Sequence, residues 1–184
     1  MEANEHIFLI GFSGSGKTTV GTHLARRLDL AFVDTDAIIE KRAGRTIRQI
    51  FATAGEREFR RLERDTISEL AGDTRVSRVI ALGGGAFQSS SNRRTVAASG
   101  RTVYLSCSAR EIYRRLKHNT DRPLLHSARA GEGPNRRNMQ QKIASLLAGR
   151  RYNYRKADIT VSTTNRSPAD AVRIIQQKLR RFDV

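Results

Sequence analysis

The sequence predicts a single α/β domain in which a parallel β-sheet is covered by helices on both faces. Short apolar runs alternate with segments of helical periodicity along the 184 residues, which is the pattern of strand–helix–strand units. A glycine-rich turn joins the first apolar run to the first helical segment. No linker or internal repeat divides the chain, and its length fits one domain, residues 1–184.

Five short apolar segments are predicted to be strands: 7–10, 31–33, 79–82, 102–105 and 159–161. Asp34 follows the second of them, and Gly83, Gly84 and Gly85 follow the third. Ligands of open α/β sheets bind beyond the carboxyl ends of the strands. These residues are therefore expected at the ligand-binding edge.

The helices are predicted from apolar residues at helical spacing, such as Val20, Leu24 and Leu28 after the glycine-rich turn. The predicted ranges are 17–28, 36–43, 46–51, 55–70, 109–116, 139–147 with a possible extension to 154, and a last helix that begins near Pro168. Proline is favourable in a first helical turn.

The segment from about 117 to 138 is predicted to be a loop. It holds two of the three prolines and four arginines. A loop of this length inside a compact domain is usually functional or mobile. We therefore expect a mobile lid over a binding site.

Composition excludes several classes of protein. Hydrophobic residues make up 38% and charged residues 28%, which is typical of a globular chain. No apolar run approaches the roughly 20 residues that span a bilayer, and the first six residues lack the basic flank of a signal peptide. The one cysteine, Cys107, cannot form an internal disulfide. A cytoplasmic protein is expected.

The formal net charge of +16 has two interpretations. One is nucleic-acid binding through phosphate contacts, and the other is a field that attracts anionic substrates. The basic residues are scattered, with several Arg pairs on helix-like segments and no basic tail. Charge alone does not choose between these functions.

Residues 11–18, Gly-Phe-Ser-Gly-Ser-Gly-Lys-Thr, match the phosphate-binding motif G-x-x-x-x-G-K-[ST] in full. Glycines let the backbone turn its N–H groups around phosphate oxygens, and the N-terminus of the next helix favours an anion. Lys17 supplies a charge for the β- and γ-phosphates, and the Thr18 hydroxyl is a ligand for Mg²⁺. The residues expected at the nucleotide are Gly14, Ser15, Gly16, Lys17, Thr18 and Thr19.

The position of the acidic residues favours a kinase over a motor ATPase. A motor is expected to carry an Asp at the end of an apolar strand such as 79–82, but that strand ends in glycine. Asp34 and Asp36 instead follow the second strand. A compact chain with a polar lid suits a kinase of small molecules, which must keep water away from the γ-phosphate.

Together these features resemble the shikimate kinase family over nearly the whole chain. The resemblance lies in the phosphate-binding motif and in the following residues, in order: Asp34-x-Asp36, Gly55-Glu56-x-x-Phe59-Arg60, Gly83-Gly84-Gly85, Arg122-Pro123-Leu124, and Arg150 four residues before Tyr154. It implies a P-loop kinase fold like that of nucleoside monophosphate kinases. It also implies transfer of the ATP γ-phosphate to the 3-hydroxyl of shikimate.

The resemblance also implies roles at the acceptor. Asp36 would bind the hydroxyl and orient or deprotonate it, and Arg60 and Arg150 would hold the substrate carboxylate. The three glycines 83–85 would let the backbone approach the ring hydroxyls. Arginine matches a carboxylate with two parallel hydrogen bonds, so two of them suit an acidic substrate.

At the nucleotide, the resemblance implies that Asp34 supports Mg²⁺ together with Thr18. Arg122 would close with the lid onto the phosphates and act in catalysis with Lys17 and Asp36. Arg115 would flank the adenine, together with the loop from Arg166 to Pro168.

Simpler interpretations remain for several of these residues. Asp34 and Asp36 are suited to cap a helix, because N-capping is the usual task of an Asp after a strand. Arg60, Arg115 and Arg166 are types of residue that commonly lie on solvated surfaces. Helical spacing would also let Glu63 hold Arg60. Tyr152 stands where the family often has proline, so Arg151 competes with Arg150 for the carboxylate.

Two alternative functions remain beside the first. One is another small-molecule kinase of the same fold, such as a gluconate kinase, and the other is a basic nucleic-acid-binding module that keeps a nucleotide-dependent fold. The complete Gly16-Lys17-Thr18 favours an active kinase. The expected partners are ATP or ADP and shikimate, with no membrane and no specific nucleic acid, and a monomer is expected.

Overall fold

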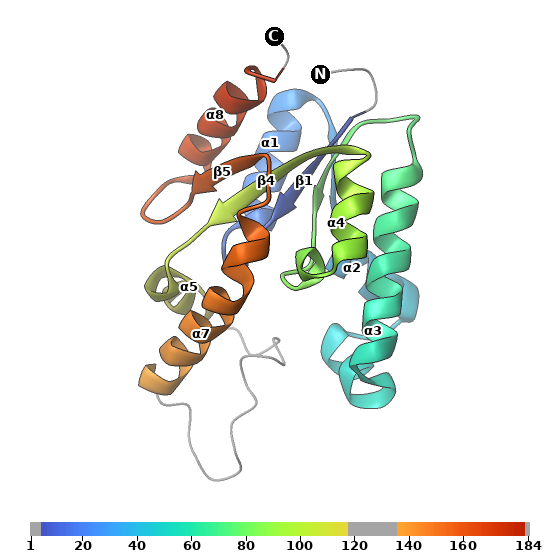
Figure 1. Cartoon of the computed structure of the whole chain (residues 1–184), viewed down its shortest axis with the longest axis vertical. Helices are drawn as coiled ribbons and strands as arrows, with labels where there is room; N and C mark the ends of the chain where they lie inside the picture. Colours follow the sequence, from blue (N-terminus) through green and yellow to red (C-terminus); the bar gives the residue numbers. More distant parts are fainter. Residues whose placement is uncertain (1–4, 118–135, 183–184) are drawn as a thin grey trace.

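The computed structural model describes residues 5–117 and 136–182, and within them five parallel strands form one sheet (Figure 1). The strands are β1 (His6–Ile10), β2 (Ala31–Asp34), β3 (Arg78–Ala81), β4 (Gly100–Ser106) and β5 (Ile159–Ser162). Their order across the sheet is β2-β3-β1-β4-β5, and every pair is parallel. The predicted α/β fold and five-stranded parallel sheet are confirmed.

The helices within the described residues are α1 (Lys17–Leu28), α2 (Thr35–Ala43), α3 (Ile47–Gly72), α4 (Ser90–Ala97), α5 (Ala109–Leu116), α7 (Arg136–Tyr154) and α8 (Pro168–Leu179), with a short 3₁₀ turn η1 (Ala86–Gln88). Helix α3 contains a break at Gly55, where φ is 80° and ψ is 172°. The two predicted helices, 46–51 and 55–70, lie on either side of this break and belong to one element, α3.

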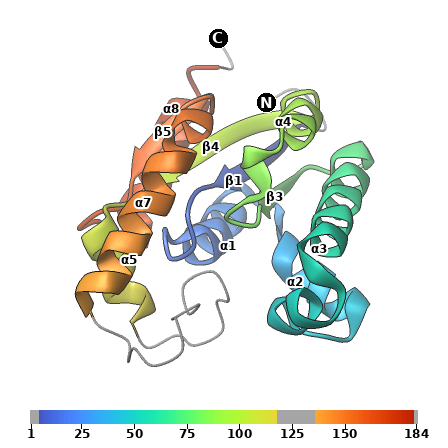
Figure 2. The ribbon, with the colours of Figure 1, turned by 60° about the horizontal axis from the view of Figure 1, so that its bottom comes forward.

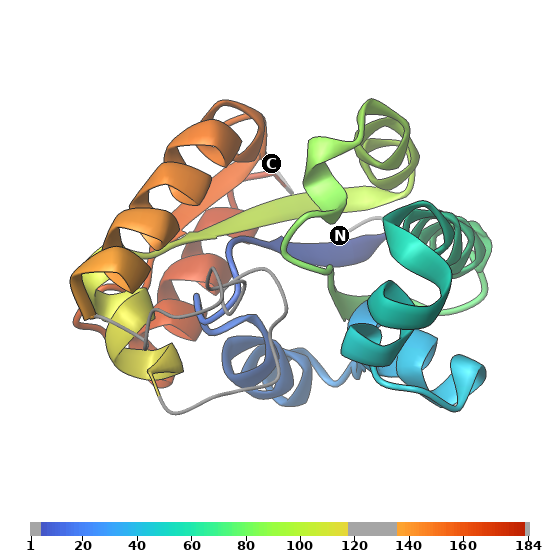
Figure 3. The same cartoon turned by 90° about the horizontal axis from the view of Figure 1, so that it is seen from below.

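Two apolar layers hold helices on opposite faces of the sheet, as Figure 3 shows with α4 and α7 above the sheet and α1 and α8 below it. On one face, Ile7 and Leu9 of β1 pack with residues of α1 and α8. On the other face, Phe8 and Ile10 pack with residues of α3, α4, η1 and α7. Alternate residues of β1 thus enter opposite layers, and all are buried, as expected for the central strand of a parallel sheet.

Two features of the fold differ from the prediction. Helix α4 and the turn η1 were not predicted, because α4 is mostly polar and has Val96 as its buried apolar residue. The predicted lid, 117–138, was too long at its C-terminal end, because α7 begins at Arg136. Residues 118–135 of the lid, Arg122 among them, lie outside the described residues.

Because the sheet is parallel, the carboxyl ends of β1, β2, β3 and β4 lie at one edge. The turn from β1 to α1 lies there between the α2–α3 pair and the α5–α7 pair (Figure 2). No helix of the described ranges is long and apolar enough to cross a membrane.

Candidate active site

The turn between β1 and α1 forms the phosphate cradle, residues 11–18. Gly14 and Gly16 have φ values of 79° and 98°, which residues with a Cβ adopt only with strain. The Ser15 N–H donates to the Phe12 carbonyl at 3.1 Å and closes the turn. Because α1 begins at Lys17, its first unpaired N–H groups and its positive dipole end face the turn.

Three polar side chains lie at the mouth of the cradle. The Lys17 ammonium donates to the carbonyls of Gly11 and Phe12, at 2.9 and 3.1 Å. The Thr18 hydroxyl donates to Asp34 Oδ2 at 3.0 Å. The cradle therefore meets the end of β2 through a hydroxyl and a carboxylate, both of them hard oxygen ligands.

Asp34 also caps helix α2. Its Oδ1 accepts the backbone N–H of Asp36 at 3.0 Å, so the simpler capping interpretation holds for this residue. The same carboxylate contacts Thr18 through its other oxygen. The Asp34 side chain thus both caps the helix and contacts the cradle, and the cap fixes the first turn of α2, which carries Asp36.

A pocket of about 370 Å³ opens at this edge of the sheet. It is lined by Gly14, Gly16, Lys17, Thr18, Thr19, Asp34, Asp36, Leu82, Arg115 and Leu116. The structure thus brings the cradle, both predicted aspartates and Arg115 to one cavity.

The three glycines after β3 form the floor of the site beside Asp36. A Cβ on Gly83 would lie 2.6 Å from Asp36 Oδ1, and a Cβ on Gly85 would lie 2.9 Å from Arg60 Nη2. Buried Thr35 ties the floor to α2, because its hydroxyl accepts the Gly83 N–H at 3.1 Å. Gly83 and Gly85 therefore lie directly against the ends of charged side chains, and a larger residue at either position would displace Asp36 or Arg60.

A buried carboxylate, Glu63, holds the charges around this floor. Glu63 is 2% exposed and accepts Arg60 Nη1 at 2.8 Å, which confirms the contact predicted from helical spacing. Burial raises the pKa of the Glu63 carboxyl, whereas the charges of Arg60 and Arg150 lower it and that of Asp36 raises it. Arg60, Arg150 and Asp36 thus all lie close enough to act on one buried group.

Arg150 reaches the floor from α7. Its Nη1 donates to the Gly84 carbonyl at 3.1 Å, and the hydroxyl of buried Tyr154 donates to the same oxygen at 2.5 Å. Burial raises the pKa of Tyr154 to about 12, so this hydroxyl stays a donor at ordinary pH. Arg151 is exposed. Of the two neighbouring arginines, the structure places Arg150 in the site.

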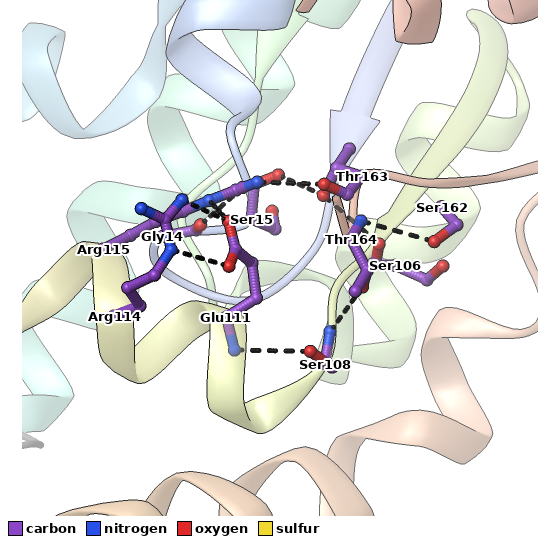
Figure 4. Close-up of polar contacts among 10 residues, drawn as sticks. All are labelled: Gly14, Ser15, Ser106, Ser108, Glu111, Arg114, Arg115, Ser162, Thr163 and Thr164. Carbon is purple, nitrogen blue, oxygen red and sulfur yellow. Dashed lines mark hydrogen bonds and ion pairs between the residues drawn. The ribbon is translucent and has the colours of Figure 1, made fainter. Parts of the chain in front are cut away.

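Arg115 holds the opposite side of the cradle (Figure 4). Its Nη1 donates to the Gly14 carbonyl at 3.2 Å, its Nη2 to the Thr163 carbonyl at 2.9 Å, and its Nε to Glu111 at 2.9 Å. Hydrogen bonding to Arg114 and Arg115 lowers the pKa of Glu111 to about 2, so the carboxylate stays charged. The guanidinium is thus fixed along its edges.

Buried Thr163, just beyond β5, supports the cradle from behind (Figure 4). Its hydroxyl donates to the Ser15 carbonyl at 2.9 Å. A trans peptide points its C=O and its N–H in opposite directions. Holding the Ser15 carbonyl therefore also fixes the direction of the Gly16 N–H.

Two of the predicted nucleotide residues lie apart from these contacts. Arg166 and Pro168 are exposed, and Pro168 is the first residue of α8. Sequence reasoning in turn missed Thr163 and Glu111. The acid three and four residues before Arg114 and Arg115 was a usable signal for Glu111, but a lone Thr after a strand carries none.

The three-layer α/β fold and the glycine-rich cradle define a P-loop kinase of small molecules. The family model described as shikimate kinase matches residues 13–180. A shikimate kinase of Mycobacterium avium (strain 104) is 47% identical over 177 residues, which cover 95% of this chain and 93% of that protein. The chain belongs to the shikimate kinase family, and it is an ATP-dependent phosphotransferase with an alcohol acceptor.

Solved structures agree with this family. A shikimate kinase from Acinetobacter baumannii in complex with shikimate has a TM-score of 0.89 and 35% identity, and the match covers 100% of this chain and 97% of that one. A gluconokinase from Sinorhizobium meliloti 1021 has a TM-score of 0.59 at 21% identity, covering 99% and 95%. The second likeness shows the shared fold alone, so the gluconate alternative is the weaker one.

Replacing Thr163 by Val tests its support of the cradle. The change keeps the shape of the side chain but leaves the Ser15 carbonyl without this donor. We expect the KM for ATP to rise about 5- to 100-fold, the range for a buried acceptor that loses its partner, while the KM for the acceptor changes less than twofold. Steady-state kinetics with each substrate varied measure both KM values.

Thr163→Ser keeps the hydroxyl and should behave like the wild type, and exposed Thr160→Val on β5 is the matched control. Equal effects on both substrates would contradict the expectation.

Proposed function

We propose that the chain transfers the γ-phosphate of ATP to the 3-hydroxyl of shikimate, giving shikimate 3-phosphate and ADP. The observation that carries this proposal is the pairing of Arg60 and Arg150 around the glycine floor beside Asp36. A site with two arginines and a carboxylate next to a phosphate cradle suits an acceptor that has both a carboxylate and a hydroxyl.

Asp36 is proposed to bind the acceptor hydroxyl. It lines the pocket with Lys17 and lies against Gly83. In the reaction, the hydroxyl oxygen forms a bond to the γ-phosphorus, the bond from that phosphorus to the bridging oxygen breaks, and ADP leaves. Asp36 accepts the proton of the hydroxyl. For a loose phosphoryl transition state, this carboxylate contributes mainly by orienting the nucleophile.

Arg60 and Arg150 are proposed to hold the acceptor carboxylate. Arg60 donates to Glu63 through Nη1 and to Glu56 through Nε and Nη2. Arg150 donates to the Gly84 carbonyl through Nη1. Arginine has five N–H donors, so each guanidinium retains N–H groups for an acceptor. Glu63 keeps Arg60 in place from beneath. The floor of Gly83, Gly84 and Gly85 offers a ring substrate backbone atoms without side chains in the way.

Lys17, Gly14, Ser15, Gly16, Thr18 and Thr19 are proposed to hold the nucleotide phosphates. Arg115 is proposed to flank the adenine, since its edges are bonded to the protein and its face is the remaining surface for stacking. Arg166 and Pro168 keep their proposed place beside the adenine. Arg122 keeps its proposed role in lid closure and phosphate contact, although it lies outside the described residues.

The residues at the cradle fit Mg²⁺ that arrives with the nucleotide. Such an ion needs only one or two protein ligands besides phosphates and water, and it prefers oxygen. The Thr18 hydroxyl and the Asp34 carboxylate, 3.0 Å apart, supply this set. In the described ranges, no group of three or more His, Cys, Asp or Glu could hold a metal by itself. When bound, Mg²⁺ neutralises charge on the β- and γ-phosphates.

The chain is further proposed to act as one domain, residues 1–184, with a lid inside the predicted segment of about 117–138, before α7 begins at Arg136. It is proposed to work as a cytoplasmic monomer. Size-exclusion chromatography with light scattering checks the oligomeric state.

The first test compares acceptors. With Mg²⁺ and ATP, purified protein should release ADP with shikimate as acceptor. It should release little with gluconate or with nucleoside monophosphates, because these lack the combination of ring hydroxyls and one carboxylate that the floor and the arginines fit. A coupled ADP assay measures the rates. Faster turnover with gluconate would contradict the proposal and favour the alternative.

The second test concerns Asp36. Asp36→Asn keeps the shape of the side chain but removes its charge, so kcat should fall by about 10²–10⁴-fold while the fold, followed by circular dichroism, is unchanged. Lys17→Met is the companion variant and should lose nearly all turnover. If Asp36→Asn stays active and Asp34→Asn is inactive, the roles of the two aspartates are exchanged.

The third test concerns the carboxylate. Arg60→Ala and Arg150→Ala should each lower kcat/KM for shikimate by roughly ten- to a hundredfold, the cost of about 1.5–3 kcal/mol for a charged hydrogen bond, with little change in ATP binding. Exposed Arg151→Ala is the matched control and should have almost no effect. An acceptor in which a neutral amide replaces the carboxylate should make each penalty much smaller. Equal penalties for acid and amide would show that these arginines do not contact the carboxylate.

A further inference from the structure

Phe12 is the aromatic residue inside the phosphate-binding motif, and its side chain is buried in an apolar cluster. The ring is 3% exposed and packs in a cluster with Ile112, Leu116 and Ile143. The guanidinium of Arg150 lies over the ring, with Cζ 5.2 Å from its centroid. This distance is within the range of a cation–π contact. The motif therefore contributes one side chain to the acceptor half of the site.

The glycine floor and the phosphate cradle also meet beside Phe12. A Cβ on Gly84 would lie 3.2 Å from the backbone nitrogen of Ser13 and 3.7 Å from the carbonyl carbon of Phe12. The acceptor floor thus packs directly on the backbone of the cradle. Arg150 spans this junction, because it donates to the Gly84 carbonyl and covers the Phe12 ring.

The Phe12 side chain is not needed for phosphate binding, so it can take part in binding the acceptor. The phosphates are bound by backbone N–H groups, Lys17 and Thr18, and a phenyl ring offers them nothing. The second position of the motif accepts any residue type as far as the phosphates are concerned. Its side chain is therefore free to serve another ligand. A long arginine side chain loses rotamer freedom when it binds, so a ring that already holds the guanidinium lessens this loss.

We propose that Phe12 is a positioning residue for the acceptor: it holds Arg150 where the guanidinium meets the acceptor carboxylate. A residue inside the nucleotide-binding motif thus sets affinity for the acceptor and not for ATP. The inference rests on the proposed function, in which Arg150 binds that carboxylate.

Phe12→Leu tests the proposal, since it keeps an apolar side chain and removes the ring. The KM for shikimate should rise about three- to thirtyfold, the range that a partly desolvated cation–π contact provides, while the KM for ATP stays within twofold. In the Arg150→Ala background, Phe12→Leu should cause no further loss. With the neutral amide analogue of shikimate as acceptor, the penalty of Phe12→Leu should nearly vanish.

Ile143→Val is the matched control, because it reduces packing in the same cluster and leaves the ring. It should leave both KM values unchanged. Circular dichroism checks that Phe12→Leu is folded, and Phe12→Met replaces it if it is not.

The proposal is overturned if Phe12→Leu raises the KM for ATP as much as that for shikimate, or if its penalty adds in full to that of Arg150→Ala. If Arg150→Ala itself leaves the kinetics with shikimate unchanged, the carboxylate role of Arg150 fails and the inference fails with it. If Arg150→Ala is impaired and Phe12→Leu is not, the inference alone fails.

Discussion

The contact between two backbone turns, the one after β1 and the one after β3, is the constraint on which the site depends. A Cβ on Gly84 would come within 3.2 Å of Ser13 N, which is tighter than side-chain packing normally allows. A side chain at Gly84 would have to push the acceptor floor and the phosphate cradle apart by a few tenths of an ångström. Phosphoryl transfer needs donor and acceptor oxygens within bonding reach, and this glycine keeps the two turns that position them in direct contact.

Charge in the site is arranged around a buried carboxylate. Glu63 is 2% exposed. It forms an ion pair with Arg60, and the charges of Arg150 and Asp36 also act on its pKa. A buried charge is tolerated only when it is paired, and here the pairing helps to hold Arg60, which also donates to Glu56 through Nε and Nη2. The ion pair with Glu63 thereby orders the Arg60 guanidinium beside the glycine floor.

The parts of this protein that could be predicted are those that depend on neighbours in the sequence. The cradle is a contiguous motif, the strands are short apolar runs, and Glu63 lies one helical turn from Arg60. Contacts between distant segments could not be predicted in this way. The Thr163 hydroxyl meets the Ser15 carbonyl across 148 positions, and Arg150 meets Gly84 across 66. Helix α4 was missed because it has a mostly polar sequence, and the structure instead holds it with a Ser89 cap and buried Asn92 and Val96.

The glycine floor has a consequence for resistance to inhibitors. A compound that rests on Gly83 and Gly85 touches positions where any larger residue would collide with Asp36 or Arg60, at 2.6 and 2.9 Å. Mutations there that exclude the compound would also displace the groups proposed to bind and activate the acceptor. Escape by substitution at the floor therefore carries its own loss of fitness. Contacts with exposed side chains such as Arg151 offer a compound no such protection, because those residues can change freely.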